Sequence, residues 1–133
     1  MSAIPEKYRD ILTKVTLAHV ATINPDGTPQ CTPVWFRLSE DGHGIEINSA
    51  KGRRKDKNMR ANPQVAMSIV DPDNAYRYLE IRGVVVNITE EGADESIDAL
   101  TKRYLGKDKY PFRQPGEVRV RYLIEPRHCT YMG

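Results

Sequence analysis

The sequence lacks several features that whole classes of protein require. It contains two cysteines, one tryptophan and three histidines in 133 residues. No apolar run approaches the roughly 18 residues that a membrane-spanning helix needs, and there is no repeat or low-complexity tract. The charged amino-terminal segment does not resemble a secretory signal. These absences exclude a disulfide-rich scaffold, a helical membrane protein and a repeat protein.

The two cysteines, Cys31 and Cys129, could pair in principle, but nothing in the sequence requires a disulfide. Because no export signal is evident, we expect reduced thiols and a cytoplasmic location. Both residues lie in segments with strand-like patterning, so we expect each to be a small buried hydrophobic residue.

The common catalytic motifs are also missing. His19, His43 and His128 have no metal-ligand spacing with one another or with the cysteines. The sequence has no GxSxG, HExxH, Walker or GxGxxG motif. We therefore expect no metal site and no catalytic side chain. If the protein is an enzyme, a bound cofactor performs the chemistry.

Length and composition are typical of one folded domain. A chain of 133 residues with 39% hydrophobic and 29% charged residues can bury one sizeable core. We therefore expect a single domain over residues 1–133. The formal net charge of +2 is too small for a general polyanion binder. We expect no nucleic-acid partner and, without an apolar span, no membrane partner.

Hydrophobic alternation and turn signals predict a mainly β fold, and nine glycines with nine prolines suit a turn-rich chain. Strands are expected at 16–23, 28–38, 44–49, 64–71, 75–88 and 117–125. The first three would form an antiparallel meander. Pro29 and Pro33 place the strand 28–38 at an edge or a bulge, and Gly83 is expected to mark a bulge.

Three short helices complete the prediction, at 5–14, 51–62 and 90–105. In the second helix only Met59 and Ala61 could face a core, and Ser49 could cap its start. Thr89 could cap the third helix. Six strands with three short helices are most economically arranged as a small β-barrel with a helix over one end.

One local cluster of charge stands out. Residues 51–60 carry six basic residues and one acid, a charge of +5, so the rest of the chain sums to −3. Asn48 and Ser49 end a strand and Gly52 follows, so N–H groups, a hydroxyl and cations would converge as they do at phosphate sites. A solvated basic surface and a nucleic-acid patch are the alternatives, but the segment lacks the aromatic residues typical of single-strand binding.

The ordered set TPVWF, GRRK, NPQVA and EIRG resembles the pyridoxamine-phosphate-oxidase-like split β-barrel superfamily. More narrowly, it is similar to the branch that uses the deazaflavin coenzyme F420 rather than FMN. The resemblance spans about residues 8–130. It implies a six-stranded antiparallel split β-barrel of the FMN-binding type. It also implies a homodimer that holds the cofactor in a groove at the subunit interface.

The resemblance also implies which residues bind the cofactor. The strand 32–35 would run along the ring system, and the strand with Tyr78 would border the ring from the other side. The phosphate would lie by the basic turn, where Arg53 and Lys55 match the family best. The implied cofactor-binding residues are Thr32, Pro33, Val34, Trp35, Asn48, Ser49, Lys51, Arg53, Arg54, Lys55, Asn58 and Tyr78.

Three further expectations accompany this set. The partner subunit would complete the site with Tyr110, Phe112 and Arg113 of its late loop. Trp35 could pack in the core instead of contacting the ring. Lys51, Lys57 and Arg60 could bind the anionic tail of F420, which favours F420 modestly over FMN.

The implied activity is hydride transfer from reduced F420 to an unsaturated small-molecule substrate, such as an enone, a lactone or a linear tetrapyrrole. No side chain needs to act as an acid, since solvent can protonate the product. The alternatives are an FMN-dependent oxidoreductase of the same fold and a non-catalytic protein that binds F420 or a flavin.

Overall fold

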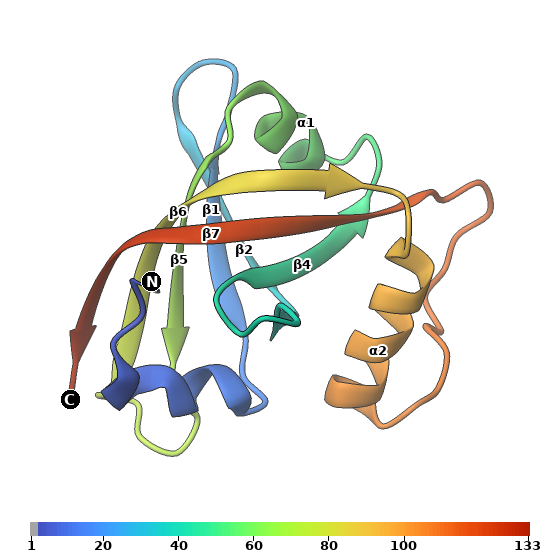
Figure 1. Cartoon of the computed structure of the whole chain (residues 1–133). Coiled ribbons are helices and arrows are strands. Elements are labelled where there is room, and N and C mark those ends of the chain that lie inside the picture. Colours follow the sequence, from blue (N-terminus) through green and yellow to red (C-terminus); the bar gives the residue numbers. More distant parts are fainter. Residues whose placement is uncertain (1–2) are drawn as a thin grey trace.

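The chain forms an antiparallel sheet curled into a half-barrel, as seen in a computed structural model that describes residues 3–133 (Figure 1). The prediction of a mainly β fold is confirmed, but these residues hold seven strands rather than six, in the order β2-β1-β5-β6-β7-β4-β3. The strands are β1 (Ala18–Ile23), β2 (Pro29–Val34), β3 (Phe36–Leu38), β4 (Ile45–Ala50), β5 (Gln64–Val70), β6 (Tyr78–Thr89) and β7 (Arg119–Met132).

The extra strand arises because the predicted strand 28–38 is divided at Trp35. Its first part, β2, pairs with β1 at one edge of the sheet, and its second part, β3, pairs with β4 at the opposite edge. Both antiparallel pairings of the predicted meander are therefore present, but residues 28–38 do not form one strand that lies between its two neighbours. The edge position inferred from Pro29 and Pro33 is confirmed, since an edge strand tolerates residues that cannot donate a hydrogen bond.

Tyr104 stabilises the break from outside the sheet. The backbone N–H of Phe36 donates to the Tyr104 hydroxyl at 3.1 Å, and that hydroxyl donates to the carbonyl of Thr16 at 2.6 Å. The hydroxyl thus links the backbone just after the break to the segment that leads into β1.

The two longest strands, β6 and β7, are neighbours in the middle of the sheet. β6 and β7 pair along their length, with a register shift at Arg82/Gly83 that confirms the bulge expected at Gly83. A Cβ atom at position 83 would lie 2.7 Å from the carbonyl oxygen of Glu125, so only glycine fits there. β7 extends past the predicted end at residue 125 to Met132, which pairs with Tyr78.

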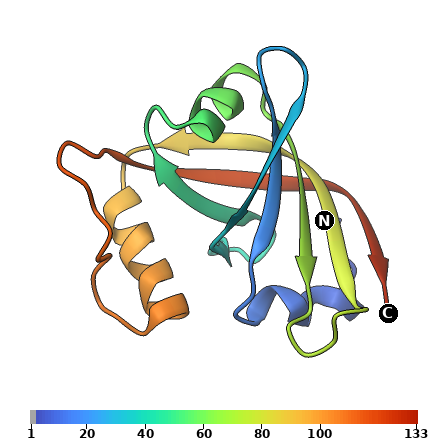
Figure 2. The same cartoon turned by 180° about the vertical axis from the view of Figure 1, so that it is seen from behind.

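Three short helices surround the sheet. In Figures 1 and 2, η1 (Glu6–Thr13, a 3-10 helix) and α1 (Arg54–Ala61) lie at opposite ends of the half-barrel, and α2 (Ala93–Leu105) lies beside β4. No helix within residues 3–133 combines the length and apolarity that crossing a membrane would take.

Apolar side chains from the sheet and from η1 form one core. Tyr8, Ile11 and Leu12 of η1 are buried against it, and so is Met59 of α1. The largest fully buried side chains are Tyr122, Phe36, Ile11, Leu12, Ile45, Ile47, Met59, Met67, Ile69, Leu79, Ile81 and Leu100.

The predictions for the helix ends and the helix faces need correction. Ala61 is exposed, and the other buried side chains of α1 are the polar Asp56 and Asn58. Arg53 rather than Ser49 precedes the first turn of α1, because Ser49 stays in β4. Gly92 rather than Thr89 takes that position at α2.

The expectation that both cysteines are buried is wrong for Cys31. Cys31 is exposed because it lies on the edge strand β2, and Cys129 is partly buried. Both thiols are free.

Asp71 joins η1 to the turn between β5 and β6. Its carboxylate accepts hydrogen bonds from Lys14 Nζ and from Arg77 Nη1, both at 2.9 Å, and from the backbone N–H of Asp73. Arg77 also pairs with Asp10 of η1 at 2.7 Å. The hydrogen bond from Lys14, followed by those from Asp73 and Arg77, lowers the pKa of Asp71 from 3.8 to about 2.

The substitution Asp71→Asn is expected to reduce the acid dependence of stability. Because the folded state lowers the pKa of Asp71, the stabilisation is fully present above pH 3.8 and is lost as the pH falls through about 2. The variant should therefore melt several degrees lower at pH 7, and its deficit should shrink below pH 4. Thermal melts from pH 2 to 7 measure this, with the exposed Asp108→Asn as the control. A deficit that is the same at every pH would contradict it.

Candidate functional site

A cavity of about 370 Å³ lies between the strand break at Trp35, the start of α1 and α2. Its wall combines two kinds of side chain. Aromatic rings come from Trp35 and from the loop between α2 and β7, and cationic groups come from the turn before α1 and from β7. A cavity lined in this way suits a ligand with a planar ring and an anionic group.

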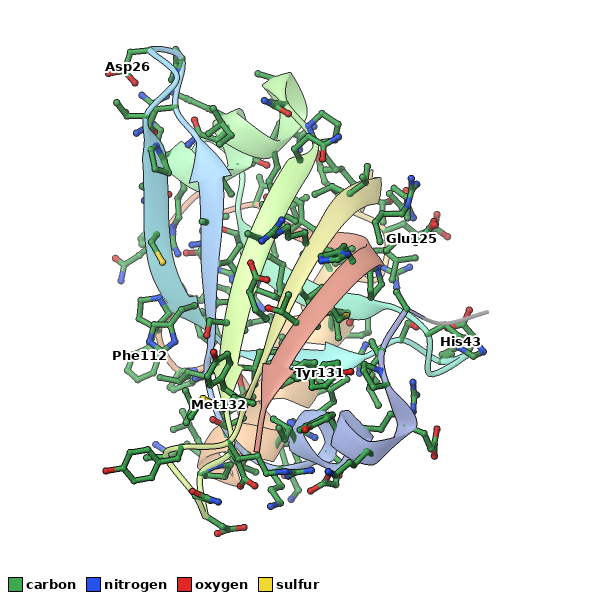
Figure 3. All side chains as sticks on the ribbon, turned by 90° about the vertical axis from the view of Figure 1, so that its left-hand side faces the viewer. Asp26, His43, Phe112, Glu125, Tyr131 and Met132 are labelled. Atoms are coloured by element: carbon green, nitrogen blue, oxygen red, sulfur yellow. The ribbon has the colours of Figure 1, made fainter. Side chains whose placement is uncertain are left out.

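Four aromatic side chains form a continuous cluster at the cavity. Trp35 stacks on Tyr104 with ring centroids 5.2 Å apart, and Tyr110 contacts Trp35 edge-on at 6.3 Å. Phe112 contacts Tyr110 at 5.7 Å and is 57% exposed beside the end of β2 (Figure 3). Trp35 therefore packs within the protein and lines the cavity at the same time.

Three cations line the rest of the wall: Arg53, Lys55 and Arg119. Arg119 is only 4% exposed, and its Nε donates to Asn48 Oδ1 at 2.9 Å. Asn48 in turn donates to the carbonyl of Ala93 at 2.9 Å. This chain of hydrogen bonds fixes the guanidinium of Arg119 between β4 and α2.

Lys55 has no ion pair or side-chain hydrogen bond with any described residue. Burial, and next the positive charges of Arg53 and Arg119, lower the pKa of its ammonium group. An anion bound in the cavity would relieve this repulsion. The structure thus holds an unneutralised cation where the sequence predicted a phosphate site.

A buried carboxylate sets the position of the basic turn. Asp56 is 2% exposed and accepts hydrogen bonds from the Gly52 N–H at 2.9 Å, Tyr122 Oη at 2.6 Å and Arg60 Nε at 3.0 Å. Burial acts to raise the pKa of Asp56, but the hydrogen bonds from Gly52, Tyr122 and Arg60 outweigh it and lower that pKa. Gly52 has a φ of +91°, which favours glycine.

The structure brings together half of the residues that the sequence predicted to bind a cofactor. Thr32, Ser49, Lys51, Arg54, Asn58 and Tyr78 do not line the cavity. The six that do line it are Pro33, Val34, Trp35, Asn48, Arg53 and Lys55.

Several of the residues outside the cavity have other contacts. Lys51 pairs with Glu90 at 3.1 Å, and Asn58 donates to the side chains of Thr22 and Asn24. Ser49 Oγ is buried without a hydrogen bond to the described residues. Tyr78 begins β6 and pairs with Met132, whereas Arg54 is exposed. The binding role predicted for these residues stays a prediction.

The sequence interpretation did not include Arg119, Leu17, Ile97 or Leu100 among the lining residues. In the sequence, only the alternation of β7 indicates where Arg119 lies: its neighbour Val120 points into the core, so Arg119 lies on the opposite face of the strand. Burial of an arginine on the opposite face could not be inferred without knowing that α2 covers that face.

The late loop reaches the cavity of its own chain. Tyr110 and Phe112, expected in the site of a partner subunit, line the same cavity as Trp35 of the same chain. Arg113 does not line it and pairs with Asp94 of α2 at 2.9 Å. Contribution of these residues to a partner's site stays a prediction.

A larger cavity of about 500 Å³ lies between the β3–β4 hairpin and β7. Its two arginines, Arg37 and Arg121, both pair with Glu46, at 2.6 and 3.3 Å, and Glu46 also accepts from Ser96. These cations are already neutralised, so this cavity is the weaker candidate for an anionic ligand. Within residues 3–133, no three His, Cys, Asp or Glu side chains gather as a metal site.

The chain is similar to known proteins over nearly its whole length. Residues 4–132 match the family model described as pyridoxamine 5'-phosphate oxidase. A solved structure named F420 reductase is 36% identical, with a TM-score of 0.83, covering 96% of this chain and 98% of that chain. A conserved hypothetical protein from Mycobacterium tuberculosis is 25% identical, with a TM-score of 0.75, covering 97% and 84%.

A putative pyridoxamine 5'-phosphate oxidase from Listeria innocua is 21% identical, with a TM-score of 0.70. The match covers 95% of both chains. At this identity it shows a shared fold alone.

The substitution Tyr122→Phe is expected to destabilise the protein by about 1–3 kcal/mol, because it removes one donor from the buried carboxylate of Asp56. Urea unfolding followed by circular dichroism measures this change. Tyr76→Phe is the matched control, since Tyr76 is 78% exposed. Equal stability of the two variants would show that Asp56 does not depend on the Tyr122 hydroxyl.

Proposed function

The chain belongs to the pyridoxamine 5'-phosphate oxidase family, and on this premise we propose that it is an oxidoreductase that uses the deazaflavin coenzyme F420. Membership confirms the resemblance noted in the sequence. The observation that carries the proposal is the cavity in which three cations adjoin a cluster of aromatic rings, one of these cations having no ion-pair partner among the described residues.

The residues present fit a coenzyme with a ribityl phosphate and a planar ring. Arg53, Lys55 and Arg119 would hold the phosphate, and the strand end at Pro33 and Val34, with Trp35, would flank the ring. When bound, reduced F420 supplies a hydride to an unsaturated substrate. The chain's own contribution is to orient the ring and the substrate and to keep water out.

Two observations support F420 over FMN. A relative whose structure is named F420 reductase shares 36% identity over nearly the whole of both chains. F420 also carries an anionic tail, and Lys57 is exposed and has no side-chain partner among the described residues. The other two cations suggested for the tail already pair with carboxylates, Lys51 with Glu90 and Arg60 with Asp56.

The proposal includes a homodimer. Leu17 and Phe112 line the cavity yet are 40% and 57% exposed, and Val118 next to Arg119 is 40% exposed. A second copy across a two-fold axis would cover this apolar rim and close the cavity. The aromatic residue Tyr76, in the turn before β6, is also exposed and open to such a contact.

The dimer predicts a sedimentation mass of twice the 15.1 kDa chain at micromolar concentration. Phe112→Ser should shift the equilibrium toward the monomer, because it removes exposed apolar area from the rim of the cavity. Leu105→Ser is the control, since Leu105 is 42% exposed and does not line the cavity. A wild-type mass near that of one chain would refute the dimer.

The function is tested by parallel titration of the apo-protein with F420 and with FMN. Fluorescence of Trp35, the single tryptophan of the chain, reports binding because this residue lines the cavity. Micromolar or tighter binding of F420 supports the proposal, and reduction of an enone, lactone or linear tetrapyrrole by the reduced coenzyme would identify the substrate class.

Other outcomes select other functions. Preference for FMN keeps the fold and makes the protein a flavin enzyme. Tight binding without turnover of any substrate makes it a cofactor-binding protein. Binding of neither cofactor overturns the proposal.

Lys55→Ala should weaken coenzyme binding by about 1.5–3 kcal/mol, the scale of a charge-assisted hydrogen bond. Lys55 has no ion pair or side-chain hydrogen bond with residues 3–133, so its loss should leave the melting temperature of the free protein unchanged or raise it. Lys107→Ala is the control, because Lys107 is exposed and does not line the cavity. Unchanged affinity of Lys55→Ala for the coenzyme would show that Lys55 does not bind the phosphate.

A further inference from the structure

Two residues near the cavity remain unexplained by the family resemblance: Arg119 and Glu117. Arg119 is 4% exposed and lines the cavity. Its Nε bonds to Asn48, but its Nη1 makes no hydrogen bond within the described part of the chain. Nη1 instead faces the carboxylate of Glu117 at a long 3.4 Å, so this buried guanidinium beside the cavity keeps donor capacity that its partners in the chain do not saturate.

Glu117 supplies the negative charge closest to this cation. Its side chain is 5% exposed, and the carboxylate lies 3.4 Å from Arg119 Nη1 and 3.3 Å from Arg53 Nη2. Both contacts are long, and Glu117 Oε2 makes no hydrogen bond to the described residues. Charged pairs with good geometry are closer, at about 2.7–2.9 Å. The carboxylate therefore neutralises Arg53 and Arg119 without saturating their donors.

The charges around the cavity sum to an excess of cations. Arg53, Lys55 and Arg119 line it, whereas Glu117 does not line it and contacts two of the three. Three cations and one carboxylate leave two positive charges. That excess attracts a phosphate group, which carries one negative charge as a diester and up to two as a monoester near neutral pH.

We propose that Arg119 is the buried cation that binds the phosphate group of the ligand and that Glu117 is a built-in counter-ion. Glu117 stabilises the three cations in the ligand-free protein and lowers their affinity for anions. The inference deepens the proposed function, because it concerns the phosphate-binding part of the same cavity.

The test compares Glu117→Gln with wild type. Glutamine keeps the shape of the side chain and removes its charge. The free variant should melt at a lower temperature, because three cations then lack a counter-ion. Its affinity for inorganic phosphate and for the coenzyme should rise about tenfold at low ionic strength, the scale of removing one nearby like charge from a partly solvated site. Trp35 fluorescence measures binding, and thermal melts measure stability.

Matched variants separate this effect from general changes in charge. Glu90→Gln also removes one negative charge beside a basic residue, Lys51, but on an exposed pair outside the cavity. It should change affinity less than about twofold. Arg119→Met should weaken phosphate binding at least tenfold, and Arg119→Lys should restore part of the loss. If the glutamine variant does not fold, Glu117→Ala removes the same charge.

The outcomes distinguish this inference from the proposed function. Tighter binding by Glu117→Gln supports the inference, and unchanged or weaker binding overturns it, because the carboxylate would then only position the arginines. Wild type that binds neither F420 nor FMN, with phosphate still bound more tightly by the variant, overturns the function and supports the inference. If wild type and Glu117→Gln bind F420 equally tightly, the proposed function is supported and the inference is overturned. Absence of anion binding in both forms overturns both.

Discussion

The buried carboxylate of Asp56 is the constraint on which the cationic wall depends. An ionised group that is 2% exposed is tolerated only when hydrogen bonds replace its water. Its donors come from the turn at Gly52, from α1 itself and from Tyr122 of β7. Satisfying this one carboxylate therefore fixes the turn against the sheet. Arg53 and Lys55 lie between Gly52 and Asp56 in the sequence, so the hydrogen bond that joins Gly52 and Asp56 restricts the positions of both cations.

The break at Trp35 creates the space that this wall faces. The chain leaves one edge of the sheet there and joins the opposite edge, and the Tyr104 hydroxyl bonds the backbone of Phe36, just after the break, and of Thr16, just before β1. The indole then stacks on the ring of Tyr104 instead of entering the core. The strand break therefore places aromatic rings beside the cations. One cavity can thus bind both a planar ring and an anionic group.

The cavity concentrates like charges at a cost to stability. Lys55 lacks a partner in the described chain, and its pKa is lowered by burial and by two neighbouring arginines. Buried charges elsewhere in the fold are paired, as at Asp71, whose carboxylate accepts three hydrogen bonds. The contrast supports a ligand, because repulsion among partly buried cations without a neutralising partner is typical of a functional site.

Local signals of the sequence determined much of this protein. Alternation and turn residues were sufficient for the mainly β fold, the prolines for the edge strand and Gly83 for the bulge. The basic turn is visible in the linear chain as a concentration of charge, and the family resemblance singled out Arg53 and Lys55 within it. Tertiary structure alone decided that the two parts of residues 28–38 pair at opposite edges of the sheet and that α2 lies beside Arg119. It also decided that Glu117 meets two cations and that Asp56 bonds with Tyr122, 66 residues away. These contacts join segments that are far apart in the sequence. Local sequence patterns do not indicate which distant segments meet when the sheet curls into a half-barrel.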